Sequence, residues 1–217
     1  MKQKYKVLLA MVSAVLLVAM SVLGTLAYLT DKDDIKNTFT VGQVYIKLDE
    51  EIVDEMGEPT GEGRTEDGNK YHLLPGHTYT KDPTVTVEAD SEEAFIRMIM
   101  TINEQADLDA IFAPGVKLDT ILTGYDASKW MLVDEKEVGD TRVYEFRYYK
   151  TVNTVDKAAL PLEPLFTAIE MPTHLTNEDM AKLDNLKIDI EAHAIQADGF
   201  EGDADKAWKA FDEQMNP

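Results

Sequence analysis

Several segments of this chain carry an apolar residue at every second position, and this period constrains the fold more than any other feature. Side chains of a β-strand point alternately to its two faces, so the period predicts strands with one face in a core. The clearest case is 186–194, where Ile188, Ile190, Ala192 and Ala194 alternate with polar residues. Similar alternation occurs in 39–48, 85–87, 96–102, 130–133 and 144–148, and more weakly in 166–171.

About eight short strands separated by turn residues are typical of an all-β fold, and we expect an antiparallel β-sandwich of jelly-roll or immunoglobulin-like type. Phe95 and Ile99 lie on the second face of one strand, which predicts that this strand is central and covered on both sides. Helices should be short and peripheral. Thr176 with Asp179 forms a capping pattern, and Asp203 precedes a second helix. The apolar stripe of that helix should pack on the sandwich through Ala204, Ala207, Trp208 and Phe211.

The segment 51–69 departs from the alternating period. It is rich in glycine and acidic residues, and Asp67-Gly68 is a turn signal. We therefore expect an exposed loop or the tip of a hairpin there.

Residues 1–27 have the pattern of an export signal. Three lysines precede an apolar run over 7–23, and Thr25 and Ala27 supply the small side chains that a signal peptidase requires. We expect cleavage between Ala27 and Tyr28, which leaves 28–217 as a single β-sandwich domain in a secreted protein. The alternative is an uncleaved anchor, because the apolar run extends past the cleavage site and about 20 such residues span a bilayer.

The chain is strongly acidic, with a formal net charge of -20. Removal of the signal takes away three lysines and no acidic residue, so the mature charge becomes -23. Such a surface repels phosphate backbones and anionic lipids, which argues against nucleic-acid binding and against membrane attachment after cleavage. It also repels other copies of the chain. There is no cysteine, so the core alone must hold the fold outside the cell.

No catalytic or metal-binding motif stands out among the four histidines, because none begins an H-E-x-x-H pattern. His72 and His77 are separated by a Leu-Pro-Gly turn. They are weak candidates for a metal site and are otherwise expected to be loop residues. His193 should project into solvent on the polar face of its strand, beside Glu191.

Other side chains with chemical potential have simpler interpretations. Ser91 and Ser128 lie in polar turns outside any nucleophile motif, where a hydroxyl satisfies backbone groups. Tyr144, Tyr148 and Tyr149 form either a sugar-stacking platform or, for at least two of them, part of the core. No cofactor is expected, apart from weak calcium binding to the acidic surface as a whole.

Three stretches together resemble the TasA and camelysin family of Gram-positive biofilm-matrix proteins. They are Gly24-Thr25-Leu26-Ala27-Tyr28-Leu29-Thr30-Asp31 with Asn37-Thr38-Phe39-Thr40-Val41-Gly42, Leu74-Pro75-Gly76 with Lys81-Asp82-Pro83-Thr84-Val85, and Ala194-Ile195-Gln196-Ala197 with Ala207-Trp208. The resemblance implies a jelly-roll-like domain, a signal peptide cut by a dedicated endoplasmic-reticulum-type signal peptidase, and assembly into extracellular fibres.

In such fibres the mature N-terminal segment of one subunit would complete the sheet of the next by β-strand addition. Here the donor would run from Tyr28 to about Phe39, with Tyr28, Leu29, Ile35 and Phe39 as its apolar residues, and 28–38 is otherwise a flexible arm.

We therefore expect a non-enzymatic fibre subunit in the extracellular matrix or at the cell surface. Some camelysin relatives are described as metalloproteases, so a secreted metal-dependent protease is the first alternative. A surface adhesin that does not polymerise is the second.

Overall fold

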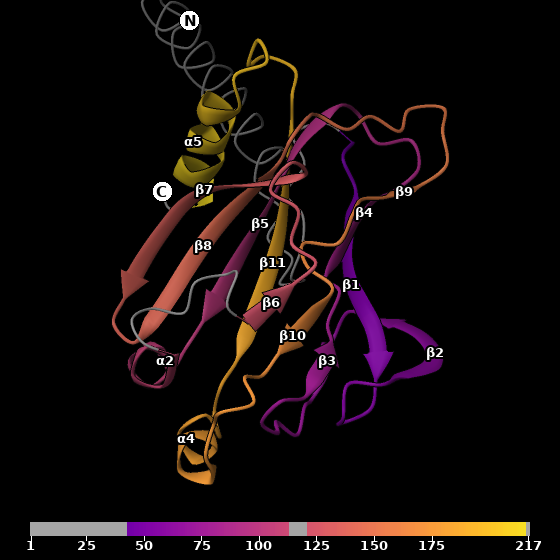
Figure 1. Cartoon of the computed structure of the whole chain (residues 1–217). Coiled ribbons are helices and arrows are strands. Elements are labelled where there is room, and N and C mark those ends of the chain that lie inside the picture. The colour runs from indigo at the N-terminus through magenta and orange to yellow at the C-terminus, as the bar shows by residue number, and fades with distance from the viewer. Residues whose placement is uncertain (1–42, 113–120, 216–217) are drawn as a thin grey trace, which may run out of the picture. The chain divides into compact units, whose positions relative to one another are not determined.

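The computed structural model describes residues 43–112 and 121–215, all of which belong to one compact unit over 36–217. The described strands form three antiparallel sheets (Figure 1). The first has the order β2 (Pro59–Thr65), β1 (Ile46–Val53), β4 (Thr84–Val87) and β9 (Leu160–Pro161). The second has the order β3 (Thr78–Thr80), β10 (Ala168–Glu170) and β6 (Leu122–Thr123). The third has the order β11 (Ile188–Gln196), β5 (Ala94–Ile102), β8 (Thr141–Tyr148) and β7 (Trp130–Val138).

The core lies between one face of the third sheet and the other two sheets. On β5 the alternate residues Ile96, Met98 and Met100 are buried, and Val85 and Val87 of β4 belong to the same apolar cluster. This arrangement confirms the predicted all-β antiparallel sandwich with short helices. It also confirms β5 as a central strand, since it pairs with β11 on one side and β8 on the other.

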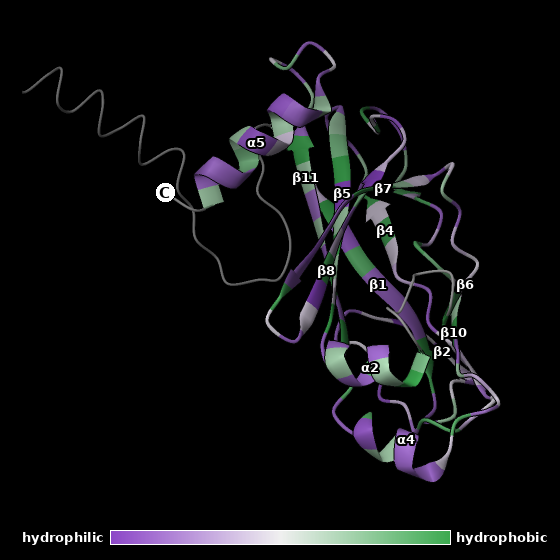
Figure 2. Cartoon of the chain, turned by 60° about the vertical axis from the view of Figure 1, so that its left-hand side comes forward, coloured by the Kyte–Doolittle hydropathy of each residue, from purple (hydrophilic) through white to green (hydrophobic). Residues whose placement is uncertain are grey.

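The outer face of the third sheet is partly covered by helix α5 (Ala204–Met215), as the apolar stripe of the sequence predicted. Trp208 and Phe211 of α5 pack with Phe95 of β5 and Ile195 of β11 in a separate small cluster. The Asp203 carboxylate accepts the Lys206 N–H at 3.1 Å and so caps the helix. Figure 2 shows α5 beside the ends of β5 and β11.

The expectation that His193 projects into solvent is wrong, because α5 covers that face of β11. The His193 ring centroid lies 5.0 Å from that of Phe211. Its Nδ1 accepts a hydrogen bond of 3.1 Å from the Arg97 guanidinium, which also contacts the Asp212 carboxylate at 2.5 Å. Arg97 therefore ties the sheet to the helix.

Of the helices whose bounds the structure describes, two more lie at the opposite end from α5 (Figures 1 and 2). They are α2 (Gln105–Phe112) and α4 (Asn177–Lys182). The predicted capping box of α4 is confirmed, since the Thr176 hydroxyl accepts the Asp179 N–H and the Asp179 carboxylate accepts the Thr176 N–H. In the part of the chain that the structure describes, no helix is long and apolar enough to cross a membrane.

The expectation for 51–69 is confirmed as a hairpin but its bounds were wrong, because β1 continues to Val53 and β2 pairs with it. The turn lies over 54–58, and Asp67-Gly68 follows β2 instead of forming the tip. Gly57 in that turn has φ +78°, and a Cβ there would lie 2.6 Å from the Tyr79 Cα. Only glycine fits this backbone and this close approach.

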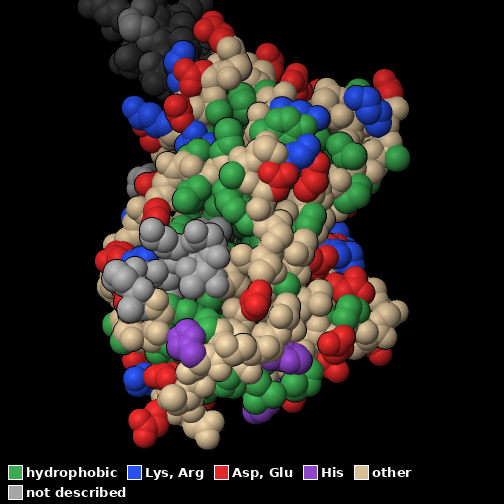
Figure 3. Space-filling model, in the orientation of Figure 1, with side chains coloured by type: hydrophobic (Ala, Val, Ile, Leu, Met, Phe, Trp, Pro, Cys, Tyr) green, Lys and Arg blue, Asp and Glu red, His purple; other side chains and the backbone are tan. Residues whose placement is uncertain are grey.

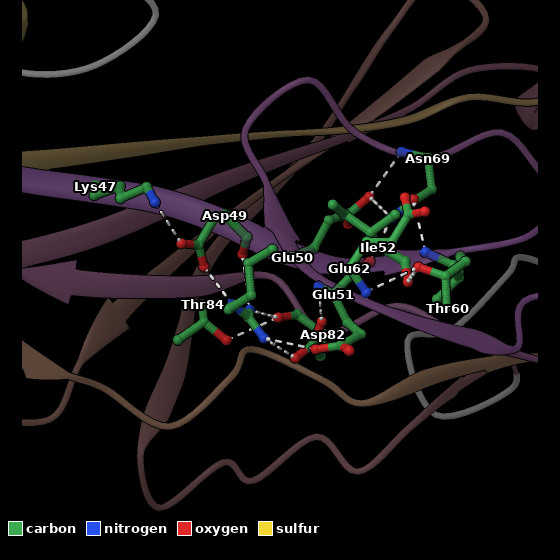
Figure 4. A network of polar contacts seen from close by, with 12 residues as sticks. Lys47, Asp49, Glu50, Glu51, Ile52, Thr60, Glu62, Asn69, Asp82 and Thr84 are labelled. Atoms are coloured by element: carbon green, nitrogen blue, oxygen red, sulfur yellow. Dashed lines mark hydrogen bonds and ion pairs between the residues drawn. The ribbon is translucent and has the colours of Figure 1, made fainter.

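Charged side chains on β1 explain why the alternation predicted over 39–48 ended after the first residues of this strand (Figure 4). Asp49 and Glu50 are buried although they interrupt the apolar alternation. The Arg64 guanidinium joins the Asp49 carboxylate at 2.5 Å to the Asp82 carboxylate at 2.6 Å. Arg64 thus satisfies the buried Asp49 charge and ties the hairpin to the chain before β4, while Glu50 pairs with Lys81.

Candidate strand-acceptor site

The predicted cleavage and donor residues lie outside the described residues. This applies to Ala27 and Tyr28 at the cleavage site, and to Leu29, Ile35 and Phe39 of the donor segment. The described structure instead shows where an added strand could be received.

Strand β11 is the outer strand of the third sheet and pairs with β5 over its whole length. The Asn103 N–H bonds the Lys187 carbonyl at one end, and the Ala197 N–H bonds the Glu93 carbonyl at the other. Since hydrogen-bonded pairs alternate in an antiparallel ladder, the peptide groups of Ile188 and Ile190 point away from β5. An incoming strand would meet these groups at the edge of the sheet.

Two adjoining hollows lie along this edge, with volumes of about 470 and 80 Å³. Both are lined in part by Gly68 and Lys81, so they form one feature, which we call the acceptor groove. Its apolar lining comes from β11, β1, β10 and the segment after β2, and consists of Leu48, Tyr71, Leu73, Ile169, Leu186, Ile188 and Ile190. Most of these side chains are only partly buried against the core. The groove thus offers an apolar floor beside an outer strand.

A buried ion pair also lines the acceptor groove. The Lys81 Nζ is 2.6 Å from the Glu50 Oε2, and the two side chains are only 10% and 7% exposed. Glu50 also accepts hydrogen bonds from the Asn69 backbone N–H at 3.0 Å and side-chain amide at 2.9 Å. These contacts hold the segment after β2, which forms one wall of the groove, against β1.

The Tyr71 side chain forms another part of the groove wall. Its hydroxyl donates to the Thr80 carbonyl at 2.9 Å. Burial, together with the nearby Glu50 carboxylate, raises the pKa of Tyr71. The phenol is therefore neutral at physiological pH and adds no charge to the groove.

The outer strand at the other end of the sheet, β7, is protected against pairing. It carries four consecutive charged residues, Asp134 to Glu137, and a register shift between Leu132 and Asp134. The Tyr125 hydroxyl donates to the Trp130 carbonyl at 2.6 Å and occupies part of this edge. Charges and bulges are common devices against edge-to-edge association. Of the two outer strands, β11 is the better acceptor.

The histidines considered as weak metal candidates have different environments. His72 exposes its side chain, whereas the His77 Nε2 lies 2.7 Å from the Met56 carbonyl oxygen and its ring contacts Tyr79 edge-on at 4.6 Å. His77 is therefore not an ordinary loop residue, because it ties the turn before β3 to the β1–β2 turn. Among the residues that the structure describes, no group of three or more histidine and acidic side chains is placed to hold a metal ion.

The predicted roles of the serines and tyrosines can also be compared with the structure. Ser91 is buried, accepts the Tyr45 N–H at 3.1 Å and donates to the Glu88 carbonyl at 2.9 Å, as expected for a turn hydroxyl. Tyr144 and Tyr148 are core residues, while Tyr149 is exposed.

Figure 3 shows acidic side chains scattered over the visible face of the molecule.

Within the residues that the structure describes, the fold and the groove define a β-sandwich protein with an apolar groove beside its outer strand β11. Residues 2–58 match the family model described as Camelysin metallo-endopeptidase. The resemblance to the TasA and camelysin family is thus confirmed over this N-terminal region, which ends within the β1–β2 turn. Comparisons with curated proteins and with solved structures gave no match.

Sequence reasoning missed the acceptor groove because its lining comes from segments far apart in the chain. Leu48 and Ile190 line the same hollow although more than 140 residues separate them. One signal in β11 could have indicated the groove. Ile188 and Ile190 are large apolar residues at the start of this strand, whereas the same face carries alanine where the strand is fully buried.

Proposed function

We propose that this protein is an exported subunit of extracellular fibres, in which the segment from Tyr28 to Phe39 of one copy pairs with β11 of the next. The observation that carries the proposal is the acceptor groove beside an outer strand. Main-chain hydrogen bonds would supply the attraction, and alternate apolar side chains of the donor would enter the groove.

The donor segment has anchors with suitable spacing for this role. Ile35 and Phe39 are four residues apart, so in a strand they project from the same face at about 13 Å from each other. A hollow of about 470 Å³ is large enough for both side chains. The first residues after the cleavage site, Tyr28 and Leu29, would extend the pairing beyond the groove.

Assembly must overcome the repulsion between subunits of charge -23. Strand addition acts at short range, whereas salt screens the repulsion over about 10 Å at 0.1 M. Fibre formation should therefore be favoured by salt or by calcium bound weakly to surface carboxylates. The partners required are further copies of the chain and, during export, a signal peptidase.

The proposal is tested by electron microscopy of the purified mature protein and of two substituted forms. Ile190→Asp puts a charge into the groove and should abolish fibres. Val138→Asp puts the same charge on β7, where Val138 is 59% exposed, and should leave fibres intact. Circular dichroism checks that both variants fold.

Two results would oppose strand addition to β11. One is fibre formation by folded Ile190→Asp protein. The other is fibre formation after deletion of residues 28–37, which removes most of the donor and leaves the groove intact.

A metal-dependent peptidase is the second candidate function, favoured by the description of the matching family model. It would require ligands that the described residues do not bring together. Casein hydrolysis by the purified protein, abolished by a chelator and restored by zinc, would establish this activity.

A further inference from the structure

A second and larger groove lies on the outer face of the third sheet, where α5 leaves β7 and part of β8 uncovered. Its volume is about 1060 Å³, and it is open to solvent. We call it the outer groove. One wall comes from the segment before β5, the end of β11 and the loop before α5, with Glu92, Glu93, Gln196 and Asp198. The other comes from β7 and the segment after β8, with Met131, Val133, Tyr149, Lys150 and Asn153.

Two cross-links hold the walls of the outer groove at a fixed separation. The Thr151 hydroxyl donates to the Glu93 carboxylate, and next to it Ala94 and Val152 exchange two backbone hydrogen bonds of 2.9 Å. The Arg147 guanidinium forms an ion pair with Asp205 of α5. Both ties are contacts within the protein, so they fix the width of the groove.

Tyr149 provides an exposed aromatic ring at the edge of the outer groove. It is 40% exposed, whereas its neighbour Tyr148 is buried and supports it edge-on at 4.9 Å between ring centroids. The Lys129 and Lys150 ammonium groups lie 4.8 and 5.0 Å from the Tyr149 ring centroid. The ring is thus fixed in orientation while part of it remains available for contact.

The lining of the outer groove suits a ligand rich in hydroxyl groups. Glu92, Glu93 and Asp198 are acceptors, Lys150 is a donor, and the amides of Asn153 and Gln196 are both. Between them lies an apolar floor that includes Phe95 and Trp208. Trp208 itself is 1% exposed, so it supports this floor from below.

The charges argue against an anionic ligand. Four carboxylates, those of Glu92, Glu93, Asp198 and Glu201, line the groove against two basic side chains, Arg147 and Lys150. Arg147 is already paired with Asp205 and Glu145. The chain as a whole carries -20. A polyanion would therefore be repelled both locally and at long range.

We propose that the outer groove binds a neutral polysaccharide chain, with one sugar ring against Tyr149 and neighbouring hydroxyls hydrogen-bonded to the carboxylates and amides of the two walls. This inference does not depend on strand addition, because the outer groove and the acceptor groove share no lining residue. It would let a single subunit hold matrix polysaccharide.

The test is a titration of the purified protein with neutral hexasaccharides, namely cellohexaose, maltohexaose and N-acetylchitohexaose, with hexagalacturonate as the anionic comparison. Binding is followed by tryptophan fluorescence, since Trp208 lines the groove and the chain has only two tryptophans. At least one neutral hexasaccharide should give a saturable change. Tyr149→Ala should weaken that binding at least tenfold, and Tyr149→Phe should largely retain it.

Tyr45→Ala is the matched control, because Tyr45 is also exposed, at 53%, but does not line the outer groove. It should leave binding unchanged. The inference is overturned if none of the neutral hexasaccharides binds, if Tyr149→Ala binds as well as the unsubstituted protein, or if hexagalacturonate binds more tightly than every neutral probe. Because fluorescence reports binding by single subunits, failure to form fibres would not affect the result.

Discussion

Replacement of Lys81 by methionine should destabilise the protein strongly, because it leaves the Glu50 carboxylate buried without its counter-ion. The pair is 2.6 Å apart and both side chains are at most 10% exposed. Breaking a buried pair by removing one partner costs about 3–5 kcal/mol. Glu50 keeps two hydrogen bonds from Asn69, so we expect the lower end, about 3 kcal/mol.

Lys47→Met is the matched control for this prediction. The Lys47 ammonium lies 3.1 Å from the Asp49 carboxylate, but its side chain is 40% exposed. An exposed pair contributes less than about 1 kcal/mol, so this variant should be nearly as stable as the original protein. Comparison of the two variants separates the effect of burial from the loss of a lysine.

Urea unfolding followed by tryptophan fluorescence measures both changes. For a domain of this size, a loss of about 3 kcal/mol corresponds to a fall of roughly 6–12 °C in the melting temperature. The double variant Lys81→Met with Glu50→Leu should recover part of the loss, because no buried charge is then left unpaired. The reasoning is refuted if Lys81→Met costs no more than Lys47→Met.

Two further predictions follow from particular contacts, and a third from the signal sequence. The Tyr148 hydroxyl donates to the Glu163 carboxylate at 2.5 Å and lowers the pKa of that carboxyl from 4.5 to about 2. Ionised Glu163 therefore stabilises the folded protein fully above about pH 4.5, and this stabilisation is lost as the pH falls towards 2. The stability difference between the unsubstituted protein and Glu163→Gln should shrink over that range, and a constant difference would contradict the assignment. His77→Ala should lower the free energy of unfolding by about 1 kcal/mol, because it removes the hydrogen bond of His77. His72 is exposed, so His72→Ala should change it by no more than about 0.5 kcal/mol. Urea unfolding measures both. N-terminal sequencing of secreted protein should begin at Tyr28, and recovery of the full chain in membranes would support an anchor instead.

The strands with one apolar face could be predicted from the sequence, because their period survives wherever a face packs on the core. Val85 and Val87, or Tyr144 and Phe146, show this on β4 and β8. On β1 the pattern reached only the first three residues, since Asp49 and Glu50 are buried through ion pairs that only the folded chain brings together.

The candidate sites were less predictable than the strands. The outer face of β11 carries alternate polar residues, yet α5 covers His193 there. The acceptor groove depends on how β11 lies against the segment after β2, which no local pattern encodes. Tyr149 could be recognised as an aromatic residue beside two others, but only the structure separates it from the buried Tyr144 and Tyr148.

The most direct test of strand addition is a mixing experiment with two variants, neither of which should polymerise alone. One lacks residues 28–37 and keeps the acceptor groove, and the other keeps the donor segment but carries Ile190→Asp. Light scattering with sedimentation of the mixture should show a one-to-one dimer that grows no further, because each dimer has neither a free donor nor an open groove. Two monomers that stay separate at all salt and calcium concentrations, or fibres formed by either variant alone, would contradict the account.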